Sequence, residues 1–133
     1  MPAYTFSATT SAPIRMVRAR VESALKDEGF GILAEIDVAA TLQARLGVDR
    51  SPYLILGACN PRFADQALEI EPSIGTLLPC NVVLRASGPE SGTTVEIIDP
   101  VAALAIAGSG DVAPIAAEAA ERLRRVLDAA VAA

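Results

Sequence analysis

The chain has 133 residues, of which 52% are hydrophobic and only 4% aromatic, so it can form one domain whose core is built from Ala, Val, Ile and Leu. It carries 11 basic and 16 acidic residues, a net charge of -5 without a basic block, which disfavours nucleic acid and anionic membranes as partners. The N-terminus lacks the basic and apolar regions of a signal peptide and no apolar run is long enough to span a bilayer, so we expect a cytoplasmic protein.

The first half of the chain alternates predicted strands with predicted helices. Strands are indicated by alternating polarity or by apolar runs, and helices by apolar residues at helical spacing. The predicted elements are a strand at 4–9, a helix at 13–28, a strand at 31–36, a helix at 38–46 and a strand at 53–59. The continuous apolar run of the third strand indicates burial on both faces.

The second half adds two strands in sequence, joined by a turn-rich segment. The predicted elements are a helix at 61–69, a strand at 80–86, a hairpin loop at 87–92, a strand at 93–98, a short apolar turn or helix at 101–107 and a last helix from about 111. The order β-α-β-α-β-α-β-β-α predicts a single α+β domain over residues 1–133. We expect helices packed on one mixed five-stranded sheet.

The two cysteines are the side chains best suited to chemistry. Cys59 ends the third predicted strand and Cys80 begins the fourth, each is followed by asparagine, and the chain contains no histidine. Two cysteines without histidine do not complete a tetrahedral zinc site or form a Cys–His nucleophile pair, so we expect no metal and no cofactor. In the cytoplasm both should be thiols, and a structural disulfide is not expected.

Cys59 directly precedes a predicted helix start, where N–H groups and the helix dipole would stabilise a thiolate. It is therefore predicted to be the more reactive thiol. The alternative is that both cysteines are simply packed apolar side chains. If their strands are neighbours, the thiols could face each other, and that geometry would also suit a dithiol switch or a two-thiolate site for a soft cation.

Three further polar residues complete the predicted site. Asn60 and Asn81 either satisfy backbone groups or contact a ligand. Glu35 shares a strand face with Asp37, and paired carboxylates can perform acid–base chemistry. The alternative is that Glu35 forms a salt bridge and Asp37 caps the following helix. If strand 80–86 runs antiparallel to the other two, these side chains share one rim of the sheet with both cysteines. Helix N-termini at that rim would favour an anionic or carbonyl ligand.

Three segments give the chain a resemblance to a known family: residues 35–48, 52–61 and 67–83, the last two carrying the Cys-Asn pairs. In this order and spacing, residues 28–105 resemble the bacterial and archaeal family called domain of unknown function 302. Leu104 departs from the pattern, because methionine is expected there. The resemblance implies an α+β fold and a homodimer, and it implies no established activity.

The leading hypothesis is a homodimeric domain that binds or senses a small ligand at the Cys-Asn rim. Dimerisation is also expected because a short chain this apolar has more apolar surface than one small core covers. The first alternative is a thiol-based redox or sulfur-transfer protein in which Cys59 attacks and Cys80 resolves. The second is a structural domain that binds a protein partner, and enzymatic activity stays open.

Overall fold

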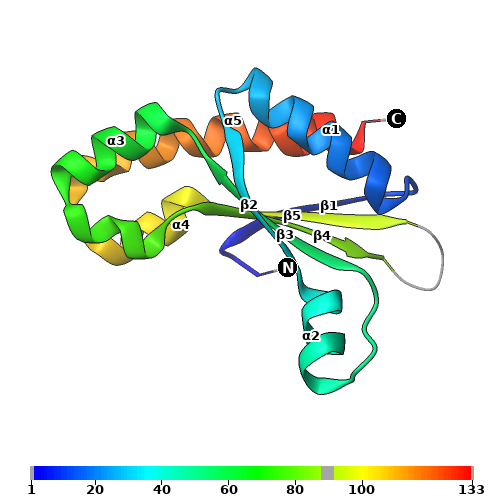
Figure 1. Ribbon diagram of the computed structural model, residues 1–133. Coiled ribbons are helices and arrows are strands. Elements are labelled where there is room, and N and C mark those ends of the chain that lie inside the picture. Colours follow the sequence, from blue (N-terminus) through cyan, green and yellow to red (C-terminus); the bar gives the residue numbers. More distant parts are fainter. Residues whose placement is uncertain (1, 88–91, 133) are drawn as a thin grey trace.

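The fold is built on a five-stranded sheet in the computed structural model, which describes residues 2–87 and 92–132 (Figure 1). The strand order is β1-β5-β4-β3-β2, and every neighbouring pair is antiparallel. The strands are β1 Thr5–Thr10, β2 Gly31–Asp37, β3 Tyr53–Cys59, β4 Cys80–Ala86 and β5 Thr93–Ile98. The predicted α+β fold and the order of strands and helices are confirmed.

The expectation of a mixed sheet is wrong. Each connection between neighbouring strands begins and ends at the same end of the sheet, so the two strands that it joins run antiparallel. Parallel neighbours require a connection that crosses the sheet to its other end. Here α2 (Val38–Leu46) joins β2 to its antiparallel neighbour β3, and α3 (Pro61–Ile70) does the same for β3 and β4. The predicted hairpin loop between β4 and β5 includes residues 88–91, which lie outside the described residues.

The longest helices cover one face of the sheet. Figure 1 shows α1 (Ile14–Asp27) and α5 (Ala113–Val131) together on one side, and α2 on the other side. The remaining helical elements are α4 Pro100–Leu104 and the short 3₁₀ helices η1 Pro72–Leu77, η2 Ala105–Ala107 and η3 Gly110–Val112. No helix in the described part of the chain is both long and apolar enough to cross a membrane.

The main core lies between these two helices and the sheet. Alternate strand residues point to this layer and are fully buried: Leu56, Val82, Leu84, Val95 and Ile97. They pack on α1 and α5 residues spaced at helical intervals: Val17, Val21, Leu25, Leu123 and Val126. A smaller cluster joins α3, η1, α4, η3 and α5 at one end of the molecule: Ala67, Ile74, Leu104, Val112 and Ala116.

Two helix starts are fixed by side chains that the sequence identifies. Asp37 caps α2, because its Oδ1 accepts a hydrogen bond from the Ala40 N–H at 2.9 Å. Gly47 ends that helix with a φ of 68°, a backbone conformation that favours glycine. Asn60 caps α3 in the same way as Asp37 caps α2, and Pro61 follows it at the first helical position.

Candidate functional site

A cavity of about 430 Å³ lies at the end of the sheet where β3 ends and β4 begins. Its floor comes from strand ends and their connections, including Ala34, Ala58, Cys59, Pro79 and Cys80. Its walls come from helices, including Ala64, Ala67 and Leu68 of α3, Leu104 of α4, and Ile115 and Ala119 of α5. Among the described lining residues none is charged, and Asn60 is the only one other than the cysteines whose side chain is polar.

The sheet register brings the two cysteines to this one cavity. Cys80 lies directly opposite Ala58, so Cys59 is one position further along β3. Alternation along a strand points Cys59 away from the face that carries Ala58 and Cys80. Both thiols nevertheless line the cavity, because it includes residues from both faces at the sheet end. Both cysteines, which lie within the described ranges, are free thiols.

Neither thiol is activated by its surroundings. Burial raises the pKa of Cys59 above its ordinary value, because a thiolate is less stable away from water. Burial raises the pKa of Cys80 to about 11, and the nearby Cys59 adds to that rise. Burial therefore acts against the lowering of the Cys59 pKa that we expected from the start of α3. Pro61 also supplies no N–H at the first helical position, which weakens that expected effect.

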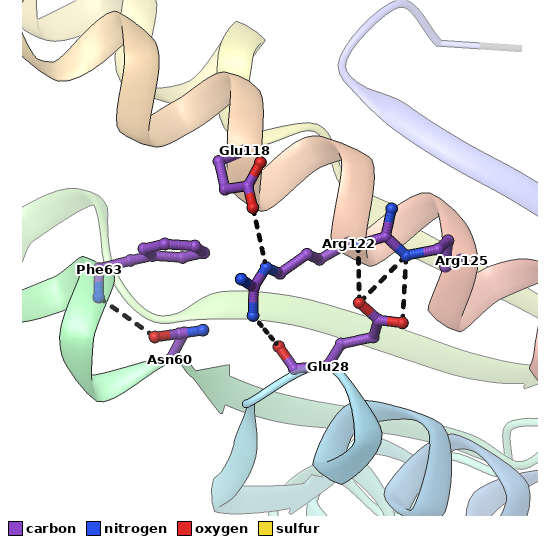
Figure 2. Close-up of polar contacts among 6 residues, drawn as sticks. All are labelled: Glu28, Asn60, Phe63, Glu118, Arg122 and Arg125. Atoms are coloured by element: carbon purple, nitrogen blue, oxygen red, sulfur yellow. Dashed lines mark hydrogen bonds and ion pairs between the residues drawn. The ribbon is translucent and has the colours of Figure 1, made fainter.

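Asn60 is buried, with 8% of its surface exposed, and its side-chain oxygen is already occupied. Figure 2 shows the Asn60 Oδ1 accepting a hydrogen bond from the Phe63 N–H, at 3.2 Å. The Asn60 amide nitrogen faces Gly29, and a Cβ atom added at Gly29 would lie 3.1 Å from this nitrogen. Gly29 also has a φ of +84°, so both its backbone conformation and the space beside Asn60 require glycine.

Arg122 of α5 fixes the turn that precedes β2 against the start of α3. Its guanidinium lies 5.1 Å from the centre of the Phe63 ring and donates hydrogen bonds to the Glu28 carbonyl at 3.0 Å and to Glu118 at 3.2 Å (Figure 2). Arg125 pairs with the Glu28 carboxylate at 2.9 Å. These contacts connect α5, α3 and the turn before β2 around the cavity. The charged residues that make them are not among the residues that line it.

The structure does not bring Glu35 and Asn81 to the cavity. Glu35 accepts a hydrogen bond from the Arg18 Nε of α1 at 2.7 Å, which is the salt-bridge role considered from the sequence. Asn81 lies in a separate cavity of about 220 Å³ with residues such as Tyr53, Val83 and Glu96. Since β2 and β3 are antiparallel, Asp37 pairs with Leu54, far from the cysteine end of β3. The predicted meeting of three strand ends and two helix starts is therefore wrong.

Most of the cavity wall was not predicted from the sequence. The part of the wall that comes from α3 consists of the apolar residues Ala64, Ala67 and Leu68, which are spaced three and one positions apart on one face of that helix. That spacing was readable as an apolar helix face, but a cavity and a filled core give the same pattern. Leu33, 70% exposed at an irregularity in the β2 register, was also missed.

Comparison with known proteins supports the family resemblance. The family described as "Domain of unknown function DUF302" matches residues 6–130, so the chain belongs to this family. It is also similar to a crystal structure described as an uncharacterized conserved protein DUF302 from Bacillus stearothermophilus. That likeness has a TM-score of 0.87 and 29% sequence identity over 96% of this chain and 98% of the other. No functionally curated protein matches the chain.

Proposed function

We propose that this DUF302 protein binds a small, uncharged and largely apolar molecule in the cavity beside Cys59 and Cys80. The observation that carries the proposal is the chemistry of the wall. The described lining has no charged side chain, and the oxygen of its one amide, Asn60, is engaged in capping α3. A charged ligand would lose its hydration there without finding a partner, whereas an apolar ligand gains from leaving water.

The size of the cavity suits a small molecule. About 430 Å³ falls within the range of roughly 300–1,000 Å³ that small-molecule sites occupy. Each buried methylene contributes about 0.8 kcal/mol, so eight of them would contribute about 6 kcal/mol before the cost of association. A gain of about 6 kcal/mol corresponds to a dissociation constant of roughly 40 µM, and the cost of association weakens it, so affinities in the millimolar range or weaker are expected.

The same wall argues against the anionic or carbonyl ligand expected from the sequence. That expectation needed free N–H donors from two helix starts at one rim. The α2 start lies at the other end of the sheet, Pro61 has no N–H, and the Phe63 N–H is bonded to Asn60. The rim therefore offers few donors to an anion.

Thiol-based redox or sulfur-transfer chemistry is the second candidate, because Cys59 and Cys80 line one cavity. Such chemistry needs a thiolate near neutral pH. Burial raises the pKa of both thiols and so disfavours the thiolate at each position. This favours the cysteines as apolar parts of a binding wall over a catalytic pair.

The test is binding of a neutral apolar probe, N-phenyl-1-naphthylamine, followed by its fluorescence and compared with an anionic naphthalene sulfonate. We expect saturable binding that prefers the neutral probe. Ala64→Phe places a large ring into the cavity and should weaken binding by roughly tenfold or more. Ala19→Phe makes the same change on an exposed part of α1 and should leave binding unchanged.

Three outcomes would contradict this function. The first is the absence of saturable binding, and the second is a preference for the anionic probe. The third is equal binding by the Ala64→Phe and Ala19→Phe proteins, because the probe would then occupy another part of the surface.

A further inference from the structure

We propose that the ligand of this cavity carries one hydroxyl group, which the amide nitrogen of Asn60 binds, so that the class of ligand is a small apolar alcohol. The inference rests on the proposed function, because it names the chemistry of one end of the molecule that the cavity would bind. Its support is a buried hydrogen-bond donor that has no acceptor among the residues that the structure describes.

Only half of the Asn60 amide is used by the protein. Its Oδ1 accepts a hydrogen bond from the Phe63 N–H at 3.2 Å, which fixes the orientation of the amide because only its oxygen can accept. The nitrogen, Nδ2, carries two N–H donors, and within residues 2–87 and 92–132 it donates to no protein atom. A polar group on a side chain this deeply buried normally has a partner. A bound molecule can supply the missing acceptor.

The groups beside Asn60 Nδ2 do not accept its hydrogens. The nitrogen faces Gly29, which presents a Cα without a lone pair, and Arg122 Nη1, which is itself a donor. The Glu28 carbonyl in this region accepts from Arg122 instead, at 3.0 Å (Figure 2). The two N–H bonds of an amide diverge in one plane, so a hydrogen that is turned away from Gly29 is available to the cavity that Asn60 lines.

The surroundings of this donor favour an uncharged oxygen. The positive charge of Arg122 is balanced by Glu118 at 3.2 Å, and a carboxylate would bring an uncompensated charge into a lining whose described residues are all uncharged. A hydroxyl group also has a hydrogen to donate. The thiols of Cys59 and Cys80 line the same cavity and are weak acceptors for it. A hydroxyl therefore uses both kinds of polar group that the wall offers.

The Asn60 donor lies at an aromatic end of the cavity. Phe63 is hydrogen-bonded to Asn60 through its N–H, and Phe30 follows Gly29 in the chain. The two rings line the cavity and meet edge to face, with their centres 6.4 Å apart. A planar apolar group next to the hydroxyl can pack against these rings. Benzyl alcohol, whose ring is one carbon from its hydroxyl, is therefore a suitable probe.

The test is an NMR titration of the full chain with benzyl alcohol and with ethylbenzene, which has a methyl group in place of the hydroxyl. We expect benzyl alcohol to shift the side-chain amide resonances of Asn60 more than ethylbenzene does. Asn60→Ser keeps a capping oxygen and removes the amide donor. It should weaken the binding of benzyl alcohol by roughly two- to tenfold, the contribution of one hydrogen bond. Its affinity for ethylbenzene should change by less than about twofold, because no hydrogen bond is lost.

The matched control is Asn81→Ser, which changes the asparagine of the separate cavity and should alter neither affinity. Circular dichroism verifies that both variants keep the fold. An Asn60→Ser protein that binds benzyl alcohol as tightly as the wild type would overturn the inference. So would an equal loss of affinity for both molecules, because Asn60 would then act through the shape of the cavity. Both results leave the proposed function standing. If neither molecule binds the wild-type chain the inference is wrong, and the proposed function is also wrong when N-phenyl-1-naphthylamine fails to bind.

Discussion

The two thiols should differ measurably in alkylation rate, and the difference can be worked out for Cys80. Its pKa lies near 11, against an ordinary value of 9.0. At pH 8 a thiol of ordinary pKa is roughly 10% ionised and one with a pKa near 11 roughly 0.1%, a loss of about 100-fold in thiolate. Each unit of higher pKa makes the thiolate more nucleophilic, which recovers about eightfold over two units. Cys80 should therefore react about tenfold more slowly than a free thiol.

Cys59 should react faster than Cys80 and more slowly than a free thiol. Burial raises the pKa of Cys59 as well, but only for Cys80 does a second thiol add to the rise. The assay uses the single-thiol variants Cys80→Ser and Cys59→Ser with iodoacetamide at pH 7 to 10, followed by intact mass. N-acetylcysteine supplies the reference rate.

The two variants unfolded in urea provide the control, because both should then alkylate at the same rate. A native Cys80 that outpaces Cys59 would refute the reasoning from desolvation. A native Cys59 that outpaces the free thiol would show that the helix start governs its ionisation after all. That result would also revive thiol chemistry as the leading function.

The remaining predictions concern stability. Asn60→Ala should lower the free energy of unfolding by about 1 kcal/mol, because the Phe63 N–H loses its acceptor. Asn60→Ser should restore part of this stability, because serine is also a good helix cap. Equal urea midpoints for the wild-type protein and the two variants would contradict this. Gly57→Ala should cost about 1–3 kcal/mol, because a Cβ would lie 2.9 Å from the Pro79 Cγ, and an unchanged melting temperature would refute the clash. The free energy of unfolding should be largest below pH 9 and fall by about 3 kcal/mol as the pH rises through 11, since the folded state holds the pKa of Cys80 near 11 while the unfolded thiol ionises lower. Cys80→Ala should remove most of that fall, and an alkaline fall that persists in this variant would assign it to other groups.

Local signals explain the part of the site that was predictable. An asparagine before a proline favours a helix start whether or not the rest of the fold is known, because the cap needs only the next three residues. Asn60 shows this directly. Two cysteines at the junction of successive strands lie close together whenever those strands pair as neighbours, as Cys59 and Cys80 do. Glu35 could not be placed in the same way, because its strand direction relative to β3 depends on the path of α2.

The sequence by itself determined the strands, the helices, their order and the caps at Asp37 and Asn60, because these depend on neighbours along the chain. Only the tertiary structure decided the direction of β2, which removed Glu35 from the cysteine site. Asn81 lies in a separate cavity because it points to the face of β4 opposite to that of Cys80. The tertiary structure also decided the chemistry of the cavity. A wall made from three helices and several strand ends has no local signature, and whether a thiol ionises there depends on how much water those distant elements exclude.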